Sequence, residues 1–161
     1  MNRATKTERA LGAILMLGAS LGLLSYALDA SAFGEARTAA VAALMAFAYL
    51  FAAHAGWRLW QGNSFGRKWA PWLFAAQVPL LSLPGFEYGW YAGINAGLKF
   101  FWSAGTHSYT ILASAGAGGG ALWTSQFDGY AIGFNAFAAC AALALLRPIK
   151  SFKPRLLRGS T

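Results

Sequence analysis

The chain of 161 residues has one cysteine, few acidic residues and few charged residues of any kind. The single cysteine, Cys140, excludes an intrachain disulfide, a CxxC redox pair and a cysteine-based zinc site. Charged residues make up 11% of the chain, against about 25% in a soluble domain, and 57% of the residues are hydrophobic. A soluble core of this size cannot hide so much apolar surface, so lipid is expected to solvate much of the chain.

Acidic residues number five against thirteen Lys and Arg, which gives a formal net charge of +8. In a soluble protein this charge would suggest a nucleic-acid partner. Here the basic residues lie in short segments beside apolar runs, so we expect them to set membrane topology and expect no nucleic-acid binding. The sequence has no Walker loop, no nucleophile elbow and no metal-ligand repeat, and it therefore indicates no cofactor and no metal.

Four apolar runs of 17 or 18 residues contain no Asp, Glu, Lys or Arg. These runs are Leu11–Leu28, Ala39–Gly56, Trp69–Phe86 and Tyr130–Leu146. Backbone polar groups must be paired inside lipid, so each run is predicted to be a helix at the short end of the ~17–25 residues that span a bilayer. The predicted fold is an all-α integral membrane protein with four transmembrane helices and a partly β outer segment.

Eleven of the thirteen Lys and Arg residues fall on one side of this predicted zigzag. The positive-inside rule makes that side cytoplasmic, with both termini, in a plasma or bacterial inner membrane. A cleaved signal peptide is the alternative for Leu11–Leu28, because Ala30-Ser31-Ala32 fits a cleavage site, although the run exceeds the usual ~7–15-residue signal core. The basic tail 147–161 is expected to lie on anionic lipid through Arg147, Lys150, Lys153, Arg155 and Arg158.

The segment 85–129 is the one long connection, and the topology places it on the outer face. With Tyr130 at its edge, it holds 11 of the 25 aromatic residues and ten of the 19 glycines. A disordered linker would be poor in aromatic residues, so this segment is predicted to be folded. An alternative makes Ser108–Trp123 a fifth span, but this would place the basic tail on the outer side, against the charge rule.

Two patterns divide the outer segment. Its first part has a glycine at every fourth position, which favours a close-packing stripe on an interfacial or re-entrant helix over a glycine-rich loop. These glycines are Gly85, Gly89, Gly93 and Gly97. The second part is predicted to form a small antiparallel sheet from Leu98–Ser103, Ser108–Ser114 and Ala121–Phe127.

Polar groups inside the apolar runs are the candidates for intramembrane function. Gln77 and Asn135 are the strongest of these, and hydrogen bonding between helices is favoured for both over the lining of a substrate path. Gly18 and Gly22 in the first run are spaced for close helix packing.

The favoured hypothesis for function is protein–protein contact through the outer segment, as an accessory subunit or an immunity-type binding protein. The predicted contact residues are its aromatic side chains, namely Trp90, Tyr91, Phe101, Trp102, Tyr109 and Trp123. One alternative is a small transporter or lipid-handling protein with Gln77 and Asn135 along its path. A second alternative is a membrane enzyme that uses Glu87, His107 or Asp128 as acid or base.

Overall fold

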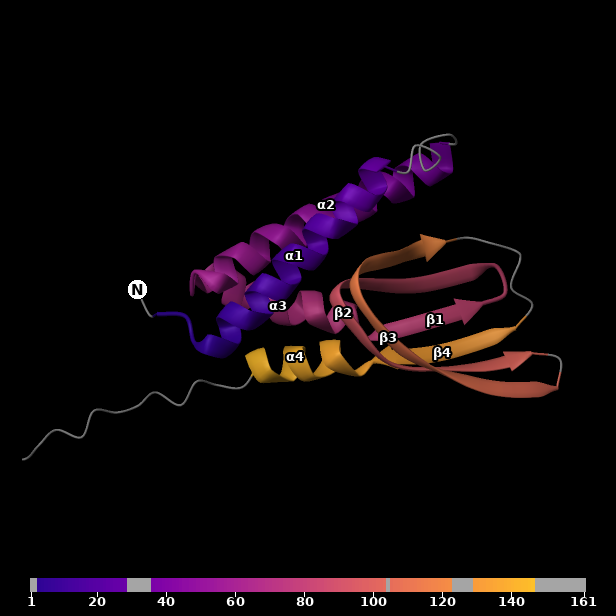
Figure 1. Ribbon diagram of the computed structural model, residues 1–161. Helices are drawn as coiled ribbons and strands as arrows, with labels where there is room; N and C mark the ends of the chain where they lie inside the picture. Colours follow the sequence, from indigo (N-terminus) through magenta and orange to yellow (C-terminus); the bar gives the residue numbers. More distant parts are fainter. Residues whose placement is uncertain (1–2, 29–35, 104, 123–128, 147–161) are drawn as a thin grey trace, which may run out of the picture.

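The computed structural model describes residues 3–28, 36–103, 105–122 and 129–146. Its elements, in chain order, are α1 (Lys6–Leu28), α2 (Ala36–Trp60), α3 (Ser64–Ala76), β1 (Pro79–Leu83), β2 (Phe86–Ser103), β3 (Thr106–Leu122), β4 (Tyr130–Asn135) and α4 (Ala136–Leu146). The long helices α1 and α2 lie side by side, and the short helices α3 and α4 lie at one end of a sheet (Figure 1).

The prediction of an all-α fold with four transmembrane helices is wrong, because four antiparallel strands follow the third helix. The predicted helix Trp69–Phe86 is the end of α3 followed by strand β1. Gln77 caps α3, and Pro79 follows two residues later. Proline cannot donate the next helical hydrogen bond and disfavours helical geometry in the residue before it, so the chain leaves the helix here.

The predicted helix Tyr130–Leu146 is also wrong over its first third, where Tyr130–Asn135 forms β4. Large apolar residues alternate there with Ala131, Gly133 and Asn135, which is the period of a strand. The glycines spaced by four residues from Gly85 are not on a helix or in a loop either, because Phe86–Ser103 is the strand β2. The predicted runs Leu11–Leu28 and Ala39–Gly56 do lie within α1 and α2.

The strands β1, β4 and β2 close into a ring. β1 pairs antiparallel with β4 along one edge and with the start of β2, up to Tyr88, along the other. The second edge of β4 pairs with the end of β2, from Gly97 to Trp102. β3 runs along the opposite edge of β2 from the hairpin turn onward. One strand, β2, therefore contributes both ends of the ring, and its middle must bend.

Glycine permits that bend at one step of the β2–β3 hairpin. Gly93 and Gly116 face each other across the two strands and have φ angles of +114° and +131°. Residues other than glycine rarely adopt such φ values. Because the two glycines are paired, both strands bend at the same place. The bend lies against α1, where a Cβ added to Gly18 would stand 1.9 Å from the backbone nitrogen of Gly93.

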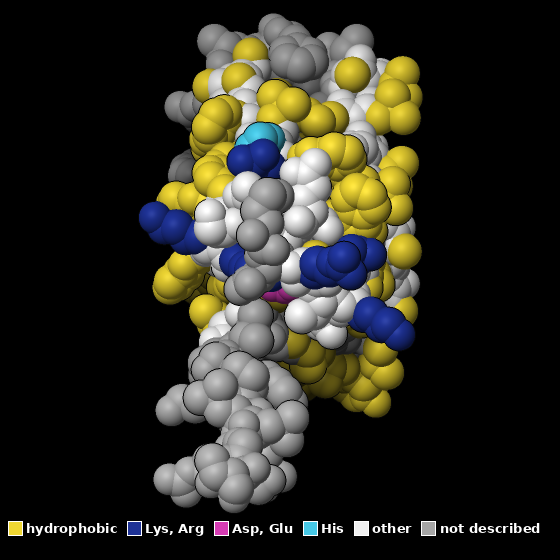
Figure 2. All heavy atoms as spheres, turned by 90° about the vertical axis from the view of Figure 1, so that its left-hand side faces the viewer, with side chains coloured by type: hydrophobic (Ala, Val, Ile, Leu, Met, Phe, Trp, Pro, Cys, Tyr) yellow, Lys and Arg dark blue, Asp and Glu magenta, His cyan; other side chains and the backbone are white. Residues whose placement is uncertain are grey.

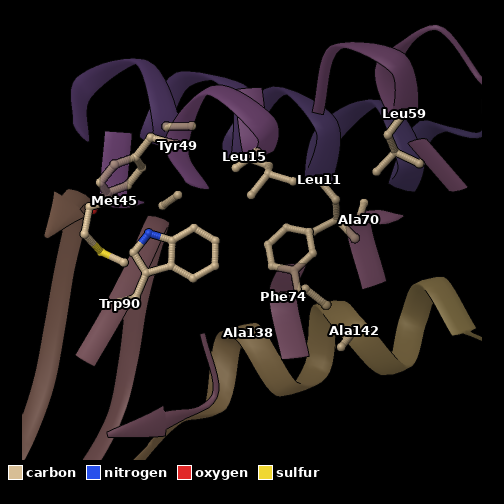
Figure 3. Packing of buried hydrophobic residues seen from close by; sticks show 14 residues of the cluster. Leu11, Leu15, Met45, Tyr49, Leu59, Ala70, Phe74, Trp90, Ala138 and Ala142 are labelled. Carbon is tan, nitrogen blue, oxygen red and sulfur yellow. The ribbon is translucent and has the colours of Figure 1, made fainter. Parts of the chain in front are cut away.

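The main core lies between α1, α2, α3, α4 and the bend of β2. Trp90 of β2 packs edge-on against Tyr49 of α2, with ring centroids 6.0 Å apart. Phe74 of α3 lies on the other side of this indole in Figure 3, and it packs against Phe137 of α4. The sheet is thus joined to the helices by large buried side chains.

Candidate functional site

The middle of β2 has an unpaired edge inside the protein. β1 pairs with β2 only as far as Tyr88, and β4 begins pairing at Gly97, so the backbone between them faces no strand. A buried backbone N–H or C=O without a partner costs about 1–3 kcal/mol. Side chains from other elements must therefore bind this stretch.

Asn135 binds two backbone groups of that edge. Its Oδ1 accepts hydrogen bonds from the backbone N–H of Ala96 at 3.3 Å and of Ala138 at 3.1 Å, and its Nδ2 donates to the carbonyl of Ile94 at 3.0 Å. The bond to Ala138 also caps the first turn of α4. Asn135 is fully buried, so one side chain closes the gap in the ring and starts a helix.

Gln77 supplies a further bond to this edge, because its Oε1 accepts from the N–H of Ala92 at 2.9 Å. The Nε2 of this buried amide has no partner among the described residues. Neither Gln77 nor Asn135 makes the predicted bond between two helices. Each binds the bent strand instead.

A second polar cluster joins the two ends of β2 within the ring. The Lys99 ammonium donates to Ser82 Oγ at 2.8 Å and to Glu87 Oε1 at 3.2 Å, and Ser82 Oγ donates to the same Glu87 oxygen at 3.1 Å. Ser82 and most of Lys99 are buried, whereas the Glu87 side chain is 45% exposed.

In this cluster one of the predicted acid–base residues, Glu87, meets a hydroxyl, that of Ser82. The carboxylate of Glu87 binds both the ammonium and the hydroxyl, so Lys99 acts as a hydrogen-bond donor to Ser82 and not as its base. His107 does not join them, because it lies on the exposed end of the hairpin opposite Trp102. Asp128 lies outside the described residues. The observed chemistry is an ion pair that links β1 to both ends of β2.

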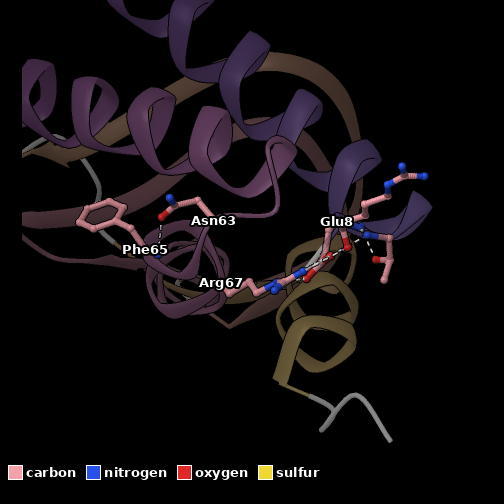
Figure 4. Close-up of polar contacts among 6 residues, drawn as sticks. Glu8, Asn63, Phe65 and Arg67 are labelled. Atoms are coloured by element: carbon pink, nitrogen blue, oxygen red, sulfur yellow. Dashed lines mark hydrogen bonds and ion pairs between the residues drawn. The ribbon is translucent and has the colours of Figure 1, made fainter. Parts of the chain in front are cut away.

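An ion pair also fastens α3 to the start of α1. Arg67 donates to Glu8 through Nε at 2.6 Å and Nη2 at 3.2 Å, and the hydrogen bond to Glu8 raises the pKa of Arg67. Thr5 and Glu8 cap α1 by exchanging side-chain and backbone hydrogen bonds. Asn63 caps α3 in the same region by accepting from the N–H of Phe65 (Figure 4).

The end of the molecule around this ion pair is basic. α1 begins here, α2 ends here and α3 begins here, which brings together Arg3, Lys6, Arg9, Arg58, Arg67 and Lys68. Figure 2 shows Lys and Arg side chains gathered on this end face, with hydrophobic side chains around them. Four exposed tryptophans lie near the same end, namely Trp57, Trp60, Trp69 and Trp72.

β3 has a long outer edge to which no strand in the described part of the chain pairs. Ser103 and Thr106 close the hairpin, and hydrogen-bonded and non-hydrogen-bonded pairs alternate from there along an antiparallel ladder. Odd-numbered residues of β3 therefore direct their backbone N–H and C=O away from β2. By the same rule, even-numbered residues of β2 direct their backbone N–H and C=O away from β3. The bonds of Gln77 to Ala92 and of Asn135 to Ile94 agree with this.

The predicted contact aromatics do not share one surface. Trp90 is 4% exposed and belongs to the core, and Tyr91 and Phe101 are partly buried. Trp102 and Tyr109 are exposed near the end of the hairpin. Trp123 lies outside the described residues, as does the tail 147–161 with its five predicted lipid-contact residues.

The predicted packing glycines have different partners. Gly18 meets the backbone of Gly93, and Gly22 meets the Tyr49 ring. Gly89 and Gly97 lie in β2, where a Cβ on Gly97 would meet the carbonyl oxygen of Phe134, and Gly85 lies in the turn before β2. Among the residues that the structure describes, no group of three or more His, Cys, Asp or Glu is placed to hold a metal ion.

No protein-family model, curated protein or solved structure matched the chain, so its role has to be inferred from its residues and their geometry.

Sequence reasoning missed Ser82 and the pairing of Glu87 with Lys99, because the partners are up to 17 residues apart and no motif relates them. The Thr5-x-x-Glu8 capping box was a local signal for the start of α1.

Proposed function

We propose that the chain is an integral protein of a plasma or bacterial inner membrane and that it acts by protein contact along β3. Two helical segments in the described part are long and apolar enough to cross a membrane, Lys6–Ser25 and Ala39–Trp60. A core helix of a soluble protein is mostly buried, whereas 39% and 33% of these two segments is buried. This low burial supports lipid around both helices.

The basic end face supports a cytoplasmic position for the start of α1 and the end of α2. Basic residues stay on the cytoplasmic side, and tryptophans such as Trp57 and Trp60 favour the membrane–water interface. The packing of α1 supports its retention over cleavage as a signal peptide, because Leu15 and Ala19 are fully buried in the core. Gly18 of the same helix touches the bend of β2.

The unpaired edge of β3 is the observation that carries the contact proposal. An exposed row of backbone donors and acceptors is a template for a strand from another chain. Nearly all side chains from Thr106 to Ala115 are exposed, so nothing described covers this part of the edge. The occupant that fits is an extended strand of a membrane or extracytoplasmic protein, as expected for an accessory subunit or an immunity-type protein.

Substituting Ala113 by proline tests this contact. Ala113 is odd-numbered and directs its N–H outward, so A113P removes one donor from the free edge and leaves the β2–β3 ladder intact. We expect A113P to weaken the complex about tenfold, because about one hydrogen bond is lost and the added strand is obstructed. Affinity capture in mild detergent, with mass spectrometry of the co-purified proteins, provides the measurement.

The matched control is A113V, which enlarges the side chain and keeps the N–H. A partner recovered by the wild-type protein and A113V but depleted with A113P supports the proposal. Equal recovery by all three proteins contradicts it. Recovery of only a second, differently tagged copy of the chain also contradicts it, since β3 would then pair with itself.

A further inference from the structure

The sheet contacts α1 and α2 near their middle and not at their outer ends. Gly18, which touches Gly93, is preceded by twelve residues of α1 and followed by ten. Tyr49, which packs on Trp90, has a similar position in α2. If α1 and α2 cross the membrane, as the proposed function holds, these contacts lie deep within the lipid layer.

The lengths of the elements agree with this depth. α1 has 23 residues and is about 35 Å long. α3 with β1 contains 13 helical and five strand residues, which together extend about 36 Å. α4 with β4 reaches the same length from 11 and six residues. Each helix–strand pair thus matches one full helix in length, and the strands run from the level of the middle of α1 and α2 past the outer ends of these helices (Figure 1).

The side chains of β4 alternate in the sense opposite to that of a soluble sheet. Tyr130, Ile132 and Phe134 are 56%, 53% and 44% exposed. The residues that alternate with them, Ala131, Gly133 and Asn135, are small or polar, and all three are buried. A strand that faces water places its large apolar residues inside, whereas a strand that faces lipid places them outside. Ile111 of β3, 71% exposed, extends the same apolar outer surface.

Four polar side chains of this region are turned inward or paired, whereas those at the hairpin end, such as His107 and Ser108, are exposed. Ser82 and Lys99 meet inside the ring, and Asn135 and Gln77 bind the bent edge of β2. A strand in lipid needs its backbone groups paired. The ring of β1, β4 and β2 pairs these strands with one another, and the partner strand of the proposed function would pair the free edge of β3.

From the contacts, the lengths and the inverted alternation, we infer that the sheet, apart from the polar end of the β2–β3 hairpin around His107, lies inside the outer half of the membrane, beside α1 and α2. The outward face of β4 and β3 contacts the hydrocarbon chains of the lipids. The inference rests on the membrane placement of α1 and α2 in the proposed function. The sequence predicted a sheet on the outer face of the membrane, and this inference places the sheet within the membrane instead.

Fluorescent labels on single cysteines test this placement. In a Cys140→Ser background, cysteines at Ile111 and Ile132 report on the sheet, and cysteines at Leu21 and Leu44 report on the helices. All four side chains are exposed, so labels fit without displacing the core. The proteins are reconstituted in phosphatidylethanolamine–phosphatidylglycerol vesicles, and emission is measured with lipids brominated in their chains and with aqueous iodide. A label at Lys68 on the basic end is the water-exposed control.

We expect brominated lipid to remove as much emission at residues 111 and 132 as at 21 and 44, with iodide effective only at 68. Iodide quenching at 111 and 132, with lipid quenching kept at 21 and 44, would overturn the placement of the sheet alone. Iodide quenching at all positions would overturn the membrane location of the helices as well. The two sheet positions lie on different strands, so a local defect at one does not decide the result.

Discussion

Replacement of Asn135 by alanine is expected to lower the free energy of unfolding by about 3–6 kcal/mol, because three buried backbone groups lose their partner. Those groups are the N–H of Ala96, the C=O of Ile94 and the N–H of Ala138. The first two belong to the bend of β2 and the third to the first turn of α4. Unfolding of the purified protein in detergent, followed by circular dichroism, measures the loss.

Asn95 offers a matched control in the same sheet. It is also a buried amide, at 8% exposure, but its Oδ1 has no partner among the described residues. Asn95→Ala is therefore expected to change stability by less than about 1 kcal/mol. Similar losses for the two variants would show that Asn135 does not hold the bent strand through its hydrogen bonds.

Replacement of Gly18 by leucine is expected to destabilise the fold by about 3 kcal/mol, because it separates the sheet from α1. A Cβ at this position would overlap the backbone at Gly93, 1.9 Å from its nitrogen and 2.4 Å from the carbonyl carbon of Ala92. Backbone atoms of a paired strand cannot yield as a flexible side chain does, so α1 or the whole bend must move. The thermal unfolding midpoint in detergent measures the effect.

Ser20→Leu is the control for this substitution. Ser20 lies on the exposed face of the same helix, and its hydroxyl bonds only to the Met16 carbonyl within that helix. The same added side chain should therefore leave the unfolding midpoint nearly unchanged. An equal fall for both variants would mean that leucine affects α1 itself and that the contact with Gly93 does not hold the sheet.

The two long helices could be located from the sequence because no proline or charged residue interrupts their apolar runs. The apolar runs in α1 and α2 contain no proline and extend over several turns, so hydropathy alone locates them. The strands within β2 and β3 were partly visible from aromatic content and alternation, as in Leu98–Ser103 and Ser108–Ser114. The sequence did not show which strands these segments pair with.

The helix predictions for the third and fourth apolar runs were wrong in part because hydropathy does not distinguish an apolar strand from a helix. Pro79 after Gln77, and Asn135 in the middle of a run, were the local signals for a change of structure. Gln77 and Asn135 were both predicted to form hydrogen bonds between helices. Their true partners lie on the bent β2, as many as 41 residues away in the case of Asn135. The bend depends on contacts that no local pattern records.

The two amides and the glycine contacts share one purpose in this fold. Gly93 and Gly116 let the hairpin bend, Gly18 lets the bend reach α1, and Gln77 and Asn135 bind the backbone that the bend leaves unpaired. Along β4 this arrangement keeps Asn135 inside and the side chains of Tyr130, Ile132 and Phe134 outside. The same construction leaves β3 as the one strand with an open edge among those described.

The contact between Gly18 and Gly93 is the point on which the arrangement of sheet and helices depends, and nuclear Overhauser effects observe it directly. In isotopically labelled protein in detergent micelles, the account predicts cross-peaks between the α protons of Gly18 and the amide proton of Gly93. Cross-peaks between Gly12 and Gly56, which meet where α1 packs on α2, serve as the internal standard. Cross-peaks for Gly12 and Gly56 without any for Gly18 and Gly93 would contradict the account, because the helices would then pair without the sheet beside them.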